Sequence, residues 1–175
     1  MNQAIQEQPG TKTTERPLYS PGLEGVIAGE SALCQVDEGE AGLRYRGYAI
    51  GDLAKWSRFE EVAYLLLIGH LPTRSELDSF STLLRGHRVL PDPVQRFIDS
   101  LQPGLHPMDV LRTGISLLGL SDPDAQDGSH EANLRKSMRL LSQIPLLIAD
   151  RHRVMSGTVP RKPDESRHFA PHLLH

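Results

Sequence analysis

HPMDVLRTGISLLGL, residues 106–120, is the stretch of this sequence that most clearly predicts a buried helix. Pro107 suits the first helical position, where a missing N–H costs nothing, and Asp109 puts a negative charge in the first turn. Gly114 and Gly119 carry no side chain, so we expect another helix to come close to them. Apolar residues recur mostly at helical spacing, at Val110, Leu111, Ile115, Leu117 and Leu118. By itself, the stretch predicts a core helix of an α-helical protein.

Two helices joined by a short turn are predicted upstream of this stretch. Residues 59–68 are nearly continuous in apolar residues, so we expect a helix that is buried on most sides and ends at Gly69. Thr73 and Glu76 have the spacing of a capping box and predict the start of its companion. The apolar face predicted for this companion consists of Leu77, Phe80, Leu83 and Leu84.

A short helix is predicted just before residue 106. We expect Asp92 to cap it and Pro93 to occupy its first position. Pro103 and Gly104 should end the segment. The inward-facing residues are predicted to be Val94, Phe97, Ile98 and Leu101.

A long helix is predicted after a polar loop at residues 121–129, whose composition favours exposure. The helix should run from about Glu131 to Met155 and end at Gly157. Pro145 lies inside it and should kink it, because proline removes one backbone hydrogen bond. Its apolar stripe is predicted at Leu134, Met138, Leu141, Ile144, Ile148 and Met155.

The N-terminal region has no helical periodicity and is rich in glycine. Residues 26–27, 32–36 and 43–45 predict three short strands, with a turn in which Gly39 and Gly42 can take positive φ. We therefore expect an all-α fold with a small N-terminal β-meander. Three parts are predicted: a polar flexible tail at 1–20, the β-meander at 21–50 and a helical domain at 51–175.

Composition excludes several classes of function. A net charge of −3 offers no basic field for nucleic acid, and no apolar run approaches the roughly 20 residues that span a bilayer. Cys34 is the only cysteine, so no intrachain disulfide can form, which fits a reducing cytosol. The first residues carry neither a secretory nor a transit signal. We therefore expect a cytoplasmic protein.

Five blocks of the sequence, in order, resemble the citrate synthase family, including its 2-methylcitrate synthase relatives. These blocks are GLEGV at 22–26, LRYRGYAIGDLA at 43–54, EVAYLLLIGHLPTRSELDSF at 61–80, HPMDVLRT at 106–113 and RLLSQIPLLIADRHRVMSG at 139–157. The resemblance runs from about Pro21 to the last residue. It implies a multi-helical citrate synthase-like fold with small strands at its edge.

The resemblance also implies a reaction, the condensation of acetyl-CoA or propionyl-CoA with oxaloacetate, as in the tricarboxylic acid cycle. Acetyl-CoA would be a co-substrate, with no covalently bound cofactor. In the family, the catalytic histidines and aspartate follow the position that ESRHFAPHLLH, residues 165–175, matches. The resemblance thus implies an N-terminal fragment, truncated at its C-terminus, that is inactive alone and carries no catalytic, cofactor-binding or metal-binding residue.

Several residues mimic functional motifs, and we expect structural roles for them. Arg44 and Arg46 are candidate ligand contacts, although surface arginines are usually not. Gly86–Val89 and His152 resemble a catalytic loop of the family, but both lie late in predicted helices, where positive charge is favourable. His168, His172 and His175 have the spacing of metal ligands on one helical face, but a frayed terminal helix is the preferred interpretation.

Three functions remain open from the sequence. The first is a citrate synthase fragment, and the second is a non-catalytic module that dimerises or pairs with a separately encoded C-terminal half. The third is a helical metal-binding or regulatory protein outside the family. In the first two cases the apolar helices lack partners, so we expect the isolated chain to self-associate or to be marginally folded.

Overall fold

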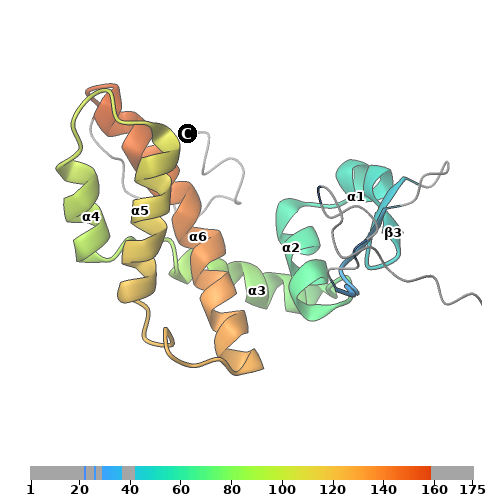
Figure 1. Ribbon diagram of the computed structural model, residues 1–175. Helices are drawn as coiled ribbons and strands as arrows, with labels where there is room; N and C mark the ends of the chain where they lie inside the picture. Colours follow the sequence, from blue (N-terminus) through green and yellow to red (C-terminus); the bar gives the residue numbers. More distant parts are fainter. Residues whose placement is uncertain (1–21, 23–25, 27–28, 37–41, 159–175) are drawn as a thin grey trace, which may run out of the picture. The chain divides into compact units, whose positions relative to one another are not determined.

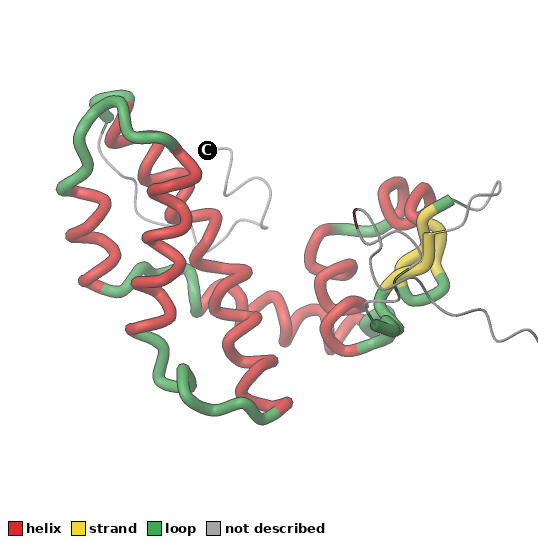
Figure 2. Tube along the Cα trace, viewed as in Figure 1, coloured by secondary structure: helices red, strands yellow, loops and turns green. Residues whose placement is uncertain are grey.

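The computed structural model describes residues 22, 26, 29–36 and 42–158. The chain divides into two compact units, residues 1–32 and 33–175, and the strands and helices below all lie in the second. Most of this unit is helical, with a small antiparallel sheet at its start, which confirms the predicted fold class. Figure 2 shows the distribution of helix, strand and loop. The predicted part boundaries at 20/21 and 50/51 stay predictions.

Three short strands form an antiparallel sheet in the order β1-β2-β3: β1 (Cys34–Val36), β2 (Leu43–Tyr45) and β3 (Tyr48–Ala49). Two of the predicted strands are confirmed, β1 in a shorter form, and Gly42 has the expected positive φ of 56°. The strand predicted at 26–27 is wrong for Val26, which is not in a strand, and its neighbour lies outside the described residues, as does Gly39.

The sequence reading missed β3 because its turn has an unusual residue. Arg46 and Gly47 form the two-residue connection between β2 and β3, with φ of 48° and 88°. Positive φ at both positions is what tight hairpin turns of type I′ require, and asparagine or aspartate is the common first residue there. An arginine in that place gives no hairpin signal in the sequence.

The first two helices are α1 (Ile50–Trp56) and α2 (Phe59–Ile68), and α2 has its predicted bounds. Gly69 ends α2 with a φ of 108°, as expected. As expected, α2 is covered on most sides: every residue between its two ends is buried or half-buried, and only the end residues Phe59 and Ile68 are 40% and 43% exposed. One side of α2 packs through Ala63 on Phe80, and the described residues leave its other side partly open.

The third helix, α3 (Arg74–Gly86), begins with the predicted capping box. The backbone N–H of Thr73 donates to a carboxylate oxygen of Glu76 at 2.7 Å, and the N–H of Glu76 donates to the Thr73 hydroxyl. Leu84 is buried, but the prediction for Leu83 is wrong, since its side chain is half exposed on the flank of the helix.

The fourth helix, α4 (Asp92–Asp99), starts one residue earlier than predicted. Pro91 occupies the capping position, and Asp92 is already helical and makes no capping hydrogen bond. Pro93, at the second helical position, has no N–H, so the first turn has one donor fewer that needs a capping acceptor. Val94 and Ile98 are fully buried, as predicted.

The last two helices, α5 (Pro107–Leu120) and α6 (His130–Met155), pack on each other and on α4 (Figure 1). Gly114 confirms the expected close approach: a Cβ there would lie 2.5 Å from a methyl carbon of Leu147 on α6. The close approach expected at Gly119 is wrong, because nothing lies within 4 Å of the position that a Cβ would take there. His106 also caps α5 by accepting the N–H of Met108 at 3.3 Å.

The apolar stripe predicted for α6 is confirmed at Met138, Leu141 and Ile144, which pack against the hydrophobic clusters, and is wrong at Ile148. Ile148 is 48% exposed, whereas Leu147 beside it is fully buried. The buried positions of α6 are Ala132, Ser142, Leu146, Leu147 and Asp150. The helix turns this side inward because Leu147 fits over Gly114, a fit that periodicity cannot reveal. Pro145 lies inside α6 and Gly157 ends it with a φ of 68°, as predicted.

Across the described ranges, no helix combines the length and the apolar character that crossing a membrane requires.

The contact between Gly114 and Leu147 predicts a stability difference between two glycines of one helix. Gly114→Ala puts a methyl group into the space of a buried leucine, and we expect it to lower the free energy of unfolding by about 1–3 kcal/mol. Gly119→Ala points into open space and should stay within about 1 kcal/mol of the wild type. Urea denaturation of both variants measures this, and equal stabilities would contradict the close approach.

Candidate functional site

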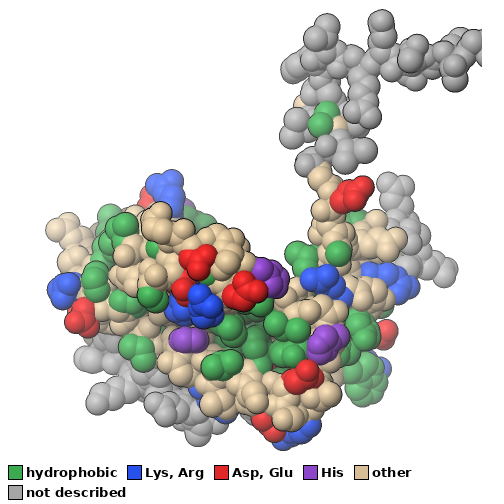
Figure 3. All heavy atoms as spheres, turned by 90° about the horizontal axis from the view of Figure 1, so that it is seen from below, with side chains coloured by type: hydrophobic (Ala, Val, Ile, Leu, Met, Phe, Trp, Pro, Cys, Tyr) green, Lys and Arg blue, Asp and Glu red, His purple; other side chains and the backbone are tan. Residues whose placement is uncertain are grey.

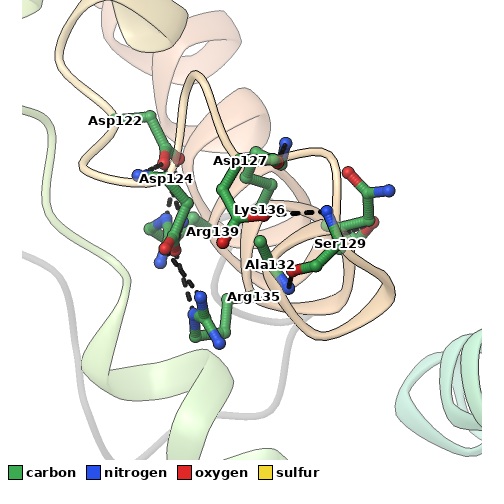
Figure 4. Close-up of polar contacts among 10 residues, drawn as sticks. Asp122, Asp124, Asp127, Ser129, Ala132, Arg135, Lys136 and Arg139 are labelled. Atoms are coloured by element: carbon green, nitrogen blue, oxygen red, sulfur yellow. Dashed lines mark hydrogen bonds and ion pairs between the residues drawn. The ribbon is translucent and has the colours of Figure 1, made fainter.

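Four charged side chains join the α5–α6 loop to the first half of α6 (Figure 4). Arg139 donates to both carboxylate oxygens of Asp122, at 2.8 and 2.7 Å, and to Asp124 at 2.5 Å. Arg135, one turn earlier on α6, donates to both oxygens of Asp124 at 3.0 and 2.7 Å. We call these four residues the ionic clamp.

The loop folds into the ionic clamp through short local hydrogen bonds. Asp122 accepts the backbone N–H of Asp124 at 2.8 Å, and Asp127 accepts that of Ser129 at the same distance. Ser129 in turn caps α6 by accepting the N–H of Ala132. Aspartate and serine favour such turns and caps because their short side chains reach nearby backbone N–H groups.

The clamp holds its two carboxylates ionised. Hydrogen bonds from Arg135 and then Arg139 place the pKa of Asp124 far below its ordinary value. Burial alone would raise the pKa of Asp122, but the hydrogen bonds from Arg139 and from the N–H of Asp124 outweigh it and lower this pKa. Each carboxylate is therefore a poor proton acceptor near neutral pH.

The prediction that residues 121–129 are simply exposed is wrong at these aspartates. The side chains of Asp122 and Asp124 are only 12% and 18% exposed, because the two arginines cover them. The partners lie 11 to 17 residues later in the chain, beyond the reach of a local composition argument. The one hint of this pairing in the sequence is that Arg135 and Arg139, four residues apart, follow an acidic loop.

Chemically, the clamp pairs two negative with two positive charges and leaves no charge over. Bidentate arginine–carboxylate pairs fix both distance and orientation. We therefore interpret the clamp as a positioning device for the connection between α5 and α6, and not as a centre of proton transfer.

The catalytic look-alike at Gly86–Val89 is the end of α3, as predicted, with His87 as its C-cap residue. Burial, together with the positive charge of Arg139, lowers the pKa of His87. The expected favourable positive charge therefore does not come from His87, and Arg85 in the last turn supplies it. Arg88 is 4% exposed, and burial lowers its pKa while the charge of Glu60 opposes this shift.

The candidate ligand arginines have structural partners. Arg44 donates to the carbonyl of Gly47 at 3.0 Å, across the hairpin. Arg46 donates to the carbonyl of Leu66 at 3.3 Å, in the last turn of α2, where a cation is favourable. His152 lies late in α6 with its side chain exposed, as predicted. The set of His168, His172 and His175 lies outside the described residues, so its role stays a prediction.

Within the part of the chain that the structure describes, no three histidine, cysteine, aspartate or glutamate side chains gather to hold a metal ion. Two cavities lie away from the clamp. One, of about 550 Å³, is an apolar groove between α2 and α6. The other, of about 300 Å³, lies between the start of α5 and the end of α6, where Arg151 and His152 join apolar side chains.

Comparison with known proteins points to one family. The model of the family described as "Citrate synthase, C-terminal domain" matches residues 22–175. A 2-methylcitrate synthase of Mycobacterium tuberculosis is 39% identical over 161 residues, which are 92% of this chain and 40% of that protein. The chain thus spans about two fifths of the length of this curated relative.

Solved structures agree with the sequence comparison. The citrate synthase of Pyrobaculum aerophilum superposes with a TM-score of 0.80 at 29% identity, covering 99% of this chain and 46% of that one. The citrate synthase of Thermoplasma acidophilum, solved in a ternary complex with carboxymethyl coenzyme A and oxaloacetate, has a TM-score of 0.81 over 89% of this chain and 41% of that one. At 23% identity, this second likeness concerns the fold alone.

The ionic clamp predicts that Arg139 of α6 contributes more to the free energy of unfolding than Arg112 of α5. Arg139→Gln leaves the largely buried Asp122 without its bidentate partner, and we expect a loss of about 1–3 kcal/mol in the free energy of unfolding. Arg112→Gln removes an exposed pair with Asp109 and should cost less than about 1 kcal/mol. Chemical denaturation at pH 7 compares them, and equal losses would show that the clamp is not stabilising.

The stability difference between the wild type and each of these two variants should depend on pH to a different extent. The clamp lowers the pKa of both aspartates, so its stabilisation is fully present above their ordinary pKa of about 4 and disappears as the pH falls toward the folded values. The stability gap between wild type and Arg139→Gln should therefore shrink below about pH 4. The gap for Arg112→Gln should change less. A gap for Arg139→Gln that is constant from pH 7 to pH 3 would refute this.

Proposed function

Because the chain belongs to the citrate synthase family, we propose that it forms the helical scaffold part of an enzyme that condenses acetyl-CoA or propionyl-CoA with oxaloacetate. The observation that carries this proposal is the family match over residues 22–175. The 2-methylcitrate synthase relatives support propionyl-CoA as an acyl donor beside acetyl-CoA.

The reaction sets chemical requirements that the described residues do not meet by themselves. A base removes a proton from the carbon next to the thioester, an acid stabilises the enol, and the enol carbon attacks the ketone of oxaloacetate. Water then cleaves the thioester and releases coenzyme A. Each step needs a positioned acid or base.

Three of the least exposed carboxylates among the described residues are paired with arginines. Asp122 and Asp124 are held ionised in the clamp, and Asp150 pairs with Arg153 at 3.1 Å. Burial raises the pKa of Asp150, but this side chain is 11% exposed and borders neither cavity described above. We therefore propose that the acid and the base come from the rest of the family's chain and that these 175 residues alone do not turn over.

Within this proposal, the chain positions and supports a catalytic part. The α4–α5–α6 core and the clamp supply a rigid frame, which a catalytic constellation needs behind it. We place the enzyme in the cytoplasm and expect it to work as a homodimer. Exposed apolar side chains at both ends of α5, Met108 and Leu120, support self-association.

The proposal predicts the outcome of an activity assay. The purified chain, mixed with acetyl-CoA or propionyl-CoA and oxaloacetate, should release no coenzyme A above a control without oxaloacetate, as followed by a thiol reagent. A fusion of the chain to the unmatched portion of the Mycobacterium tuberculosis 2-methylcitrate synthase should release coenzyme A.

Two results would contradict it. Release by the chain alone would show that it holds its own acid and base. An inactive but folded fusion would instead favour a non-catalytic binding module, and circular dichroism with thermal unfolding establishes whether the fusion is folded.

A further inference from the structure

The start of α5 and the end of α6 border a cavity of about 300 Å³, and the two helix ends lie side by side in Figure 1. This volume is at the lower end of the range that small-molecule sites occupy. The charged or titratable side chains of the lining, Arg151 and His152, are both of the basic kind. The other six lining residues are apolar: Pro107, Met108, Val110, Leu111, Leu147 and Ile148.

The apolar part of the lining has a buried floor and an open rim. Val110 and Leu147 belong to the buried core, whereas Met108 and Ile148 are 61% and 48% exposed. Water therefore reaches the cavity at the rim. An aliphatic or aromatic group that entered would remove this apolar surface from water, and such burial is favourable in proportion to the area covered.

Arg151 brings a donor without an acceptor to the lining. Its Nη2 donates to the carbonyl of Leu105 at 3.0 Å, which holds the side chain next to the start of α5. Its Nε–H is buried and has no hydrogen-bond acceptor among the described residues. A buried N–H without an acceptor costs free energy, so a ligand oxygen that bonded to it would remove this cost.

The charges around the cavity favour an anion. The first two residues of α5 line it, so the positive end of the dipole of this 14-residue helix lies at the cavity. The two carboxylates closest to the lining in sequence pair with arginines outside it, Asp109 with Arg112 and Asp150 with Arg153. Neither carboxylate lines the cavity.

An anion is selected here by contact and not by a long-range field. The chain has a net charge of −3, and Figure 3 shows acidic and basic side chains interspersed on one face of the molecule. One guanidinium matches one carboxylate, and its planar set of donors can bind both carboxylate oxygens. A ligand with several negative charges would need more cations than this lining holds.

We propose that this cavity binds a small monocarboxylate with an aliphatic or aromatic tail. The carboxylate bonds to Arg151, and the tail covers Met108, Leu111 and Ile148. One cation for the head and apolar walls for the tail define this ligand class. The inference goes beyond the proposed acyl transfer and does not rest on it, because it concerns a separate cavity and a ligand without coenzyme A.

The test is isothermal titration calorimetry of the 175-residue chain with octanoate, and with 1-octanol as a neutral ligand of the same tail length. Arg151→Gln removes the charge of the cavity. Arg112→Gln makes the same substitution at an exposed arginine of α5 outside it and serves as the matched control. Circular dichroism with thermal unfolding checks that both variants fold.

A second pair of variants keeps the test decisive if Arg151→Gln does not fold. Ile148→Glu places a negative charge at the rim, and Ile148→Gln is its neutral control. The position is half exposed, so both substitutions leave the core packing in place. Repulsion from the added charge should weaken octanoate binding by Ile148→Glu more than by Ile148→Gln.

We expect octanoate to bind the wild-type chain about tenfold or more tightly than 1-octanol, because of the charge-assisted hydrogen bonds. Arg151→Gln should remove this preference by weakening octanoate binding alone. Arg112→Gln should leave the affinity for octanoate within about twofold of the wild type.

Three results would overturn the inference. These are no binding of octanoate, equal affinity for octanoate and 1-octanol, and equal weakening of octanoate binding by the two arginine variants. Octanoate binding that disappears as the chain self-associates, followed by light scattering at rising protein concentration, would assign this face to a second copy and overturn it as well.

Discussion

The fit of Leu147 over Gly114 is the contact on which the arrangement of the larger core depends. A Cβ on Gly114 would lie within 2.5 Å of the leucine side chain, so the two helices reach this distance only because glycine has none. Leu147 is 1% exposed, and the same cluster contains Val94, Ile98 and Leu118 of the neighbouring helices. Protein interiors tolerate little change in volume, so this one contact fixes the rotation of α6 against both α4 and α5.

The ionic clamp acts on the same pair of helices from the connecting loop. A polar loop of nine residues has many conformations, and the bidentate pairs of Arg139 and Arg135 select one of them. Burial of Asp122, Asp124 and Arg139 would be costly if their charges were unpaired, but here every carboxylate oxygen has an arginine donor. The apolar contact and the ionic contact thus hold α6 at two separate places along its length.

Next to the face of α6 that packs in the core, the middle of the helix has a more open flank. This flank and α2 border an apolar groove, at which Phe59, the first residue of α2, is 40% exposed. A well-packed frame on one side and an uncovered apolar trough on the other are consistent with a scaffold that meets further protein. Both features fit the proposed function, because catalytic residues supplied by another portion of chain need a rigid support and a surface that binds that portion.

The sequence by itself determined the described helices from α2 to α6 and most of their ends, whereas α1 (Ile50–Trp56) was not predicted. The capping box of Thr73 and Glu76, the stop at Gly69 and the start at Pro107 all depend on groups a few residues apart, and the structure has them where the sequence places them. The order of five motif blocks also sufficed for the family. Arg44 and Arg46 have backbone partners, in line with the structural roles expected for them, whereas the structural roles of His152 and of the histidines at 168, 172 and 175 remain predictions.

Tertiary structure decided which side of each helix is buried and which charges meet. Ile148 and Leu147 are equally apolar neighbours, and only the space over Gly114 selects the second for the core. Asp122 and Arg139 are 17 residues apart, so no local pattern reports their pairing or the low pKa that results. Side-chain volume and long-range electrostatics depend on what lies opposite a residue in space, and that information is absent from the local spacing of its neighbours in the chain.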